Sequence, residues 1–390
     1  MKKRPTVMFY CQHSLGMGHL VRSLALAQGL TKEFRVVLLN GGRLPRQTAI
    51  PHDLEMINLP PIGLNENNEL VSQDRRRTTI RARWLRKQLL LETFTELQPD
   101  VLFIELFPFG RKKFAEELMP LLEAARSSKA LVVCSLRDIL VGRDNQAKHD
   151  DRAATIANEY FDLILVHSDP AFARLDESFK PNVKLTTPVK YTGFAMASTS
   201  SHLARKQHAT RRVIVSAGGG MVGEPLLSTA IKAHQLLERE GPVETEIITG
   251  LFLPENVRRS LHDLARGKTG LKVTRFVPDL SARMQNADVS ISQGGYNTTL
   301  DVLRANVPAL IVPFGTGRED EQLKRARRLE ALGALRVLEE KDMQPARLAS
   351  EIRDLFNFDA RRPRLDLDGV RKSTQIVFKA LASRKNGDKR

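Results

Sequence analysis

The stretch ADVSISQGGYNTTLD, residues 287–301, decides the fold of this chain. Residues 287–292 form a short apolar run typical of a buried strand, and Gly294 and Gly295 follow it directly. A helical pattern begins after the glycines, so backbone N–H groups at its start can point at an anion. The run NVPALIVP, residues 306–313, then predicts a second strand. This order of elements is typical of a parallel sheet with crossover helices.

The same alternation extends over both halves of the chain. In the first half we expect strands at residues 7–12, 35–40, 101–105, 130–135 and 163–167. In the second half we expect them at residues 213–216, 244–249, 271–275, 289–292 and 309–312. Helical patterns fill the intervals, as at residues 20–30, 112–127, 225–240, 280–286, 298–305 and 321–332.

One polar segment interrupts this alternation. Residues 195–212 read AMASTSSH before a basic stretch and show no periodicity, so we predict a linker at 198–212. The predicted fold class is α/β, with two doubly wound Rossmann-like domains facing a central cleft. We assign residues 1–197 to the first domain, 213–384 to the second and 385–390 to a polar tail.

The charge balance limits the partners. Sixty-one Lys and Arg against 45 Asp and Glu give a net charge of +16, which favours phosphates, nucleic acid or acidic lipid headgroups. No nucleic-acid-binding motif is recognisable, so we expect no nucleic-acid partner. Cys11 and Cys134 lie in predicted strands. We therefore expect both to be buried, reduced thiols in a cytoplasmic protein. With no signal-like or membrane-spanning run, we expect a cytoplasmic protein, peripheral at most on the inner face of the membrane.

A basic cluster lies within residues 75–87, which we expect to form one helix. Its cations are interleaved with Trp84 and are Arg75, Arg76, Arg77, Arg81, Arg83, Arg86 and Lys87. Two interpretations remain open: a solvated helix face, or a patch that contacts an anionic membrane surface beside a lipid-linked acceptor.

Two further glycine turns join predicted strands to helices. The segment QHSLGMGH, residues 12–19, places Gly16, Gly18 and His19 at a helix start. A second turn contains Gly218, Gly219 and Gly220, and bare backbone of this kind can bind a pyrophosphate. Tight turn geometry, or helix capping by His19, would explain each feature without any ligand.

Together these stretches resemble the nucleotide-sugar glycosyltransferases of the GT-B fold, in the MurG-like branch of family 28. The resemblance implies an enzyme, with an acceptor-side first domain and a second domain that binds the donor, a UDP-sugar. It implies donor contacts from the phosphate loop, the glycine turn, a ribose-binding acid, a sugar-binding pair and a base-binding strand end. The phosphate loop is Gly218, Gly219 and Gly220, and the glycine turn is Gly294, Gly295, Asn297 and Thr298. The ribose-binding acid is Asp301, and the sugar-binding pair is Glu321 and Gln322. The base-binding strand end is Phe276 and Val277. In the first domain, Gly16 and Gly18 match the donor-side loop, and His19 takes the position of the acceptor base.

The first domain departs from this family. The strand ends ELFPFG (105–110) and SLRD (135–138) do not match the lipid II-forming enzymes, so the acceptor, a saccharide or a lipid-linked molecule, differs. Glu105 and Asp138 follow predicted strands, where open α/β sheets bind ligands, and we predict them with His19 as catalytic residues. His19 would titrate near neutral pH and serve as the general base, with Glu105 as the substitute base.

An alternative acceptor is water. The pattern Gly-x-Gly-His-x-x-Arg, which ends at Arg22, also resembles a nucleotide-sugar hydrolase of pseudaminic acid synthesis. Neither reaction requires a cofactor or a metal. The Asp-x-Asp motif at residues 366–368 follows no predicted strand, and we interpret it as surface charge.

Overall fold

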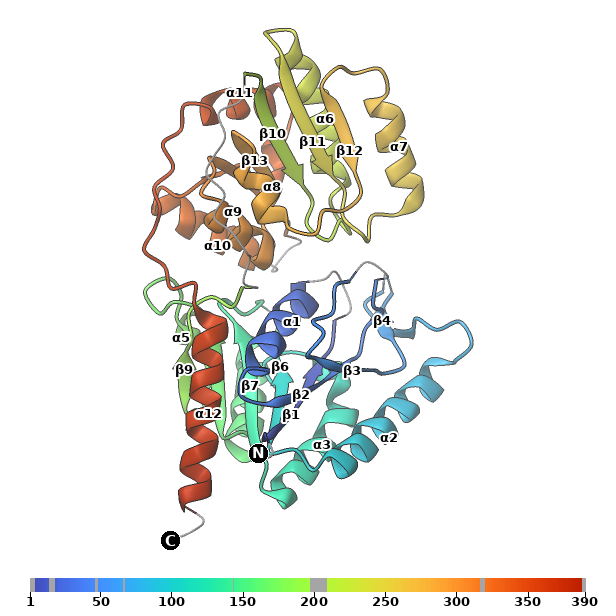
Figure 1. The fold of residues 1–390 in the computed structure, drawn as a ribbon, viewed down its shortest axis with the longest axis vertical. Helices are drawn as coiled ribbons and strands as arrows, with labels where there is room; N and C mark the ends of the chain where they lie inside the picture. Colours follow the sequence, from blue (N-terminus) through green and yellow to red (C-terminus); the bar gives the residue numbers. More distant parts are fainter. Residues whose placement is uncertain are drawn as a thin grey trace. The chain divides into compact units, whose positions relative to one another are not determined.

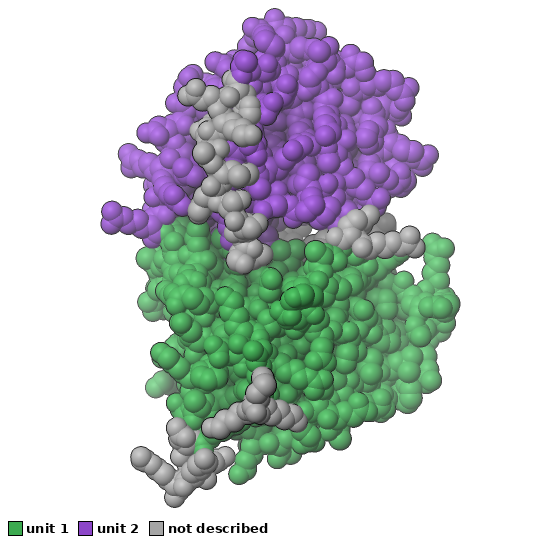
Figure 2. Space-filling model, in the orientation of Figure 1, with its two compact units in different colours: residues 1–198, 365–390 green, residues 199–364 purple. Residues whose placement is uncertain are grey.

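The computed structural model describes residues 4–13, 18–45, 48–65, 67–142, 144–196, 209–315 and 320–387. The chain divides into two compact units, residues 1–198 with 365–390 and residues 199–364 (Figure 2). Gly16 and most of the predicted linker lie outside the described residues.

The first unit is built on a seven-stranded parallel sheet (Figure 1). Its strand order is β3-β2-β1-β6-β7-β8-β9, so the order reverses between β1 and β6. The strands are β1 (Thr6–Cys11), β2 (Arg35–Asn40), β3 (Glu55–Asn58), β6 (Val101–Glu105), β7 (Leu131–Arg137), β8 (Leu163–His167) and β9 (Val189–Tyr191). Every residue of β1 and β6 is buried, as expected for central strands covered on both faces.

Helices cover both faces of this sheet. Alternate residues of β1 point into two apolar clusters, one beneath α2, α3 and α4 and the other beneath α1 and α12. The helices are α1 (Gly18–Leu30), α2 (Thr79–Leu97), α3 (Ala115–Ser128), α4 (Gln146–Tyr160), α5 (Leu175–Ser178) and α12 (Gly369–Gly387). A short hairpin, β4 (Ile62–Leu64) with β5 (Leu70–Ser72), and a 3₁₀ helix, η1 (Lys112–Phe114), complete the unit.

The C-terminal helix α12 packs on the first unit, which corrects the assignment of residues 365–384 to the second domain. A Cβ atom at Gly29 of α1 would lie 2.2 Å from Cγ1 of Val370, so the glycine allows the two helices to touch. Arg384 pairs with Asp162 at 2.7 Å at the other end of α12. The helix also continues past residue 385, where the polar tail was expected to begin. Periodicity predicts a helix but not the sheet on which it packs.

The second unit is a six-stranded parallel sheet with the order β12-β11-β10-β13-β14-β15. Its strands are β10 (Arg211–Ser216), β11 (Val243–Ile248), β12 (Leu271–Thr274), β13 (Val289–Gln293), β14 (Ala309–Val312) and β15 (Arg336–Val337). Its helices are α6 (Glu224–Glu238), α7 (Glu255–Ala265), α8 (Leu280–Gln285), α9 (Tyr296–Ala305), α10 (Glu321–Ala331), η2 (Glu340–Asp342) and α11 (Pro345–Leu355). The strand order reverses between β10 and β13, as it does between β1 and β6 in the first unit.

These sheets confirm the predicted α/β class with two Rossmann-like domains, and all ten predicted strands are present. The basic segment differs from expectation. Arg75, Arg76 and Arg77 lie in a turn, and α2 begins only after Thr78, whose side chain caps the helix by accepting from the backbone N–H of Arg81. Arg86 is fully buried, with Nε 2.8 Å from Glu117 Oε2, so it does not belong to a surface patch.

Candidate active site

In the first unit, the structure brings His19 and Glu105 together at the switch point of the sheet. His19 lies in the first turn of α1, directly after β1, and Glu105 is the last residue of the neighbouring β6. Nδ1 of His19 lies 2.6 Å from Oε1 of Glu105, and the same oxygen accepts from Arg22 at 2.5 Å. Arg22 is one helical turn from His19, so both side chains lie on the same face of α1.

The electrostatics of this cluster keep His19 neutral. Burial lowers the pKa of His19 to about 4, although the neighbouring Glu105 opposes the shift. Burial would raise the pKa of Glu105, but His19, Arg22 and Arg111 outweigh it and hold that pKa at about 2. The expectation that His19 titrates near neutral pH is therefore wrong. At pH 7 a neutral imidazole faces an ionised carboxylate, which places the proton on Nδ1 and a lone pair on Nε2.

Glu105 and Asp138 are both fully buried. One carboxylate oxygen of Glu105 is occupied by His19 and Arg22, and the other lies 3.9 Å from Nε of Arg111. Glu105 thus orients His19, which differs from its predicted contact with an acceptor and its role as substitute base. The sequence analysis did not select Arg111 as a site residue. Its position beside Glu105 depends on the fold of the loop after β6, in which Arg111 has a left-handed backbone with a φ of 57°.

In the second unit, two glycine turns follow the adjacent strands β10 and β13. Gly218 and Gly220 have φ angles of 58° and 90°, and a Cβ at Gly220 would lie 2.2 Å from the carbonyl oxygen of Thr249. A Cβ at Gly218 would lie 3.1 Å from Oγ1 of Thr298, so the two turns approach each other. Gly295, the N-cap residue of α9, provides no side-chain cap, and this helix start can receive an anion. The start of α6, after Gly223, does not suit an anion, because its first residues are Glu224 and Pro225.

Asp301 lies on α9 and is partly buried. Burial raises its pKa to about 7, which the nearby Arg304 partly opposes and Asp279 reinforces. Within the described chain, no group donates a hydrogen bond to its carboxylate. A partly buried carboxylate without such a donor can accept hydrogen bonds from ligand hydroxyls.

The remaining predicted donor residues surround the same glycine turn or lie in the loop after β12. Arg325, fully buried, contacts Glu321 at 3.1 Å and the carbonyl oxygen of Gly294 at 3.4 Å. Gln322 accepts from the backbone N–H of Phe314 at 3.1 Å. Asn297 lies half-buried in the first turn of α9. The sequence analysis missed Arg325, although it lies one helical turn from Glu321.

The base-binding prediction falls on the loop between β12 and α8. The ring of Phe276 is 37% exposed, and Val277 beside it is half-buried. Gly219 lies in the turn after β10, and Gly18 is the first residue of α1.

Among the described residues, no group of three or more His, Cys, Asp or Glu side chains could hold a metal ion. No helix in the same part of the chain is long and apolar enough to cross a membrane.

Comparison with known proteins assigns the second unit to a family. Residues 213–367 match the glycosyltransferase family 28 C-terminal domain. One relative, from Anaeromyxobacter dehalogenans strain 2CP-C, is 33% identical over 110 residues, which cover 28% of this chain and 29% of that protein. It is named UDP-N-acetylglucosamine–N-acetylmuramyl-(pentapeptide) pyrophosphoryl-undecaprenol N-acetylglucosamine transferase. The alignment thus spans less than a third of that relative's length.

Solved structures cover nearly the whole chain. MurG from Acinetobacter baumannii superposes with a TM-score of 0.57 and 16% identity, covering 96% of this chain and 99% of that one. The UDP complex of MnaA from S. aureus gives 0.63 and 12% identity, covering 97% of each chain. The fold is that of the GT-B proteins, and residues 213–367 match the glycosyltransferase family 28 C-terminal domain. The MurG-like resemblance inferred from the sequence is confirmed.

Proposed function

We propose that this protein is a glycosyltransferase that moves a sugar from a UDP-sugar donor to an acceptor hydroxyl by inverting displacement. One observation carries the proposal: two glycine turns, the uncapped start of α9 and the available carboxylate of Asp301 occur together in a domain that matches family 28. The glycine turns and the start of α9 suit a diphosphate, and Asp301 suits the ribose hydroxyls. Phe276, exposed beyond β12, suits the base.

In the proposed reaction, the two units have different tasks. Nε2 of His19 accepts the proton of the acceptor hydroxyl, while Glu105 and Arg22 hold the imidazole in the correct tautomer. The acceptor oxygen forms a bond to the anomeric carbon as the bond to the nucleoside diphosphate breaks. The leaving group carries its new charge to the turn at Gly218–Gly220 and to the start of α9, where backbone N–H groups stabilise it.

The acceptor is proposed to be a saccharide or a lipid-linked molecule. The Anaeromyxobacter relative is named for a pyrophosphoryl-undecaprenol substrate. In this chain, Ile80 and Trp84 are 83% and 49% exposed on α2, and the guanidinium of Arg81 lies 4.3 Å from the centre of the Trp84 ring. Exposed apolar side chains beside cations suit an anionic membrane surface.

A nucleotide-sugar hydrolase is the second candidate. Arg22, the last residue of the pattern that resembles the hydrolase, is buried and bound to Glu105. The same base could activate water instead of an acceptor hydroxyl. Donor turnover in buffer without any acceptor, at the rate reached with an acceptor extract, would favour hydrolysis.

The test is a thermal-shift screen of nucleoside diphosphates and nucleotide sugars, followed by transfer assays with the donor that binds. We expect UDP and one UDP-sugar to raise the melting temperature. Asp301→Ala should weaken UDP binding by roughly 1–3 kcal/mol, because ribose hydroxyls lose their acceptor. If no nucleotide stabilises the folded protein, the proposal is wrong.

A further inference from the structure

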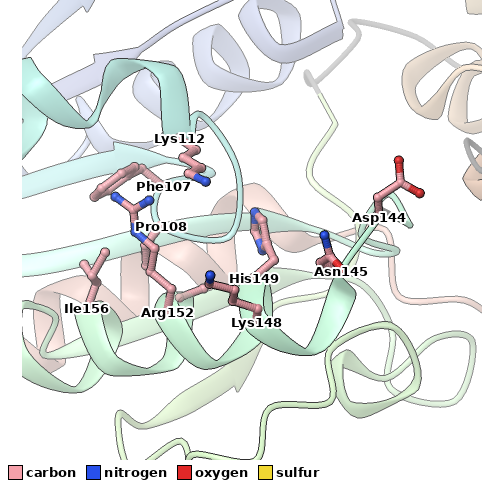
Figure 3. Close-up of a pocket in the computed structure, with 10 residues that line it drawn as sticks. Phe107, Pro108, Lys112, Asp144, Asn145, Lys148, His149, Arg152 and Ile156 are labelled. Carbon is pink, nitrogen blue, oxygen red and sulfur yellow. The ribbon is translucent and has the colours of Figure 1, made fainter.

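A cavity of about 350 Å³ lies in the first unit beside the loop after β6 (Figure 3). One wall is the ring pair Phe107 and Pro108, and the first turns of α4 form the opposite wall with Ala153 and Ile156 among them. A volume near the lower end of the range for small-molecule sites suits one sugar-sized group. Phe107, Pro108 and Ala153 are buried, so the half-buried Ile156 is the apolar side chain of the lining that can pack against such a ring.

The polar lining is dominated by cations. Lys112 reaches the cavity from η1, and Lys148 and Arg152 reach it from successive turns of α4. None of the three forms an ion pair with any residue that the structure describes. Asp144 is the acidic residue of the lining, and Figure 3 shows its carboxylate pointing away from the three cations. Three cations that are not ion-paired, beside one carboxylate, favour binding of an anion.

The same loop connects this cavity to the proposed base. Glu105 at the end of β6 holds His19, Phe107 two residues later forms the wall, and Lys112 ends the loop. Arg111 lies between them, with Nε 3.9 Å from Oε2 of Glu105. The cavity therefore lies at the C-terminal edge of the sheet, where open α/β folds bind ligands.

We propose that this cavity binds the anionic part of the acceptor, a sugar ring that carries a phosphate or a carboxylate. Lys112, Lys148 and Arg152 would bind the charged group, and the half-buried Ile156 would contact the ring. This inference rests on the proposed transferase function, because it assigns the ligand to the acceptor. It also accounts for the strand-end sequence ELFPFG, which departs from the lipid II-forming enzymes.

The experiment titrates the full-length protein with glucose 6-phosphate, glucuronate and glucose, in saturating UDP so that the nucleotide site is filled. The variant is Lys148→Ala/Arg152→Ala, since both side chains are exposed and neither touches His19 or Glu105. The matched control is Lys32→Ala, an exposed lysine of the same unit in the turn after α1. We expect one of the two anionic sugars to bind the wild type and the control, and to bind the double variant at least tenfold more weakly.

Each outcome has a definite meaning. Preference for glucose 6-phosphate identifies a phosphate, preference for glucuronate identifies a carboxylate, and both support the proposal if glucose does not bind. Equal affinity in variant and control, or no binding of either anion, overturns it. UDP binding, measured separately on the same proteins, verifies that the variant is folded. Absence of UDP binding by the wild type would instead reject the proposed function, whatever the anionic sugars do.

Discussion

In the first unit, ionisable side chains lie beyond the C-terminal ends of the neighbouring strands β1 and β6. In the second unit, glycines lie beyond the corresponding ends of β10 and β13. His19, Glu105 and Arg22 form a hydrogen-bonded cluster at the strand ends of the first unit. In the second unit, the glycines carry no side chains that could cover the backbone, and the helix starts have no side-chain caps. One topology thus provides two chemistries: proton transfer from side chains and anion binding by backbone.

The burial of charge also differs between the two units. Glu105 is paired twice, and its pKa falls to about 2, whereas Asp301 accepts no hydrogen bond from described residues and its pKa rises to about 7. A paired carboxylate supports the fold, and one without a donor costs stability until a ligand supplies one. We therefore expect the first cluster to be preorganised and the second site to be completed by its ligand.

The largest effect should come from His19→Ala, which removes the proposed base. Turnover should fall roughly 100- to 10,000-fold, the usual span for a positioned proton acceptor. UDP affinity should stay unchanged, because the second unit holds the nucleotide. The assay is transfer or hydrolysis with the donor found by thermal shift, and His52→Ala, an exposed histidine elsewhere in the unit, is the control.

The pH profile sharpens this test. Because burial lowers the pKa of His19 to about 4, the base stays neutral above that pH. The acidic limb of kcat/KM should lie near pH 4 to 5, with a plateau through pH 8. Near-full turnover in His19→Ala, or an acidic limb centred near pH 6.5, would contradict the buried neutral base.

A smaller effect should follow from Gly295→Ala. No described atom lies within 4 Å of a Cβ built at this position, and its φ of −62° suits alanine. The methyl group would meet only a bound diphosphate, so UDP affinity should fall about tenfold with little change in melting temperature. Gly220→Ala is the contrasting variant, since its Cβ would clash with Thr249 and should lower the melting temperature. Unchanged UDP affinity in Gly295→Ala would show that the diphosphate binds elsewhere.

Asp301→Asn should separate stability from binding. The pKa of Asp301 is higher in the folded chain than the usual aspartate value of 3.8, so stability decreases as pH rises from 3.8 to about 7. At pH 8 the variant should raise the free energy of unfolding by roughly 1–2 kcal/mol, below the full shift because the side chain keeps some solvent contact. It should also weaken UDP binding. Denaturant unfolding at pH 8 and pH 4 measures the first effect, with the exposed Asp359→Asn as control.

That comparison has a clear opposing result. If Asp301→Asn gains no stability at pH 8 relative to Asp359→Asn, the carboxylate is not destabilised by burial. Nucleotide affinity of the wild type that does not rise between pH 6 and 8 would count against hydroxyl donation to the ionised form.

The smallest effect concerns the membrane, and it applies to the first unit alone. Arg81→Ala/Trp84→Ala should weaken co-sedimentation with phosphatidylserine vesicles severalfold, since each surface cation contributes about 1 kcal/mol. Binding should also fall with added salt. Lys232→Ala, an exposed lysine of the second unit, should leave it unchanged. Equal binding of the wild type to neutral and acidic vesicles would reject the membrane surface.

The sequence by itself predicted ten of the strands, the glycine turns and the resemblance to family 28, but not β3, β4, β5, β9 and β15. Strand periodicity and glycine position are local properties, so the segment 287–301 predicted β13, its turn and α9 nearly residue for residue. Family 28 could be inferred for the same reason, because its motifs are contiguous. His19 could be selected as a candidate base because it lies at the start of the helix that follows the first strand.

Only the tertiary structure decided how the charges pair and where α12 packs. Glu105 lies 86 residues from His19, and nothing local indicates that it would orient the imidazole instead of meeting an acceptor. The neutral state of His19 depends on desolvation, which the packed sheet and helices supply together. Arg86 looked like part of a surface patch until its contact with Glu117 placed it in the core. Helix α12 returns to α1 because Gly29 leaves room for Val370, a fit between residues far apart in the chain.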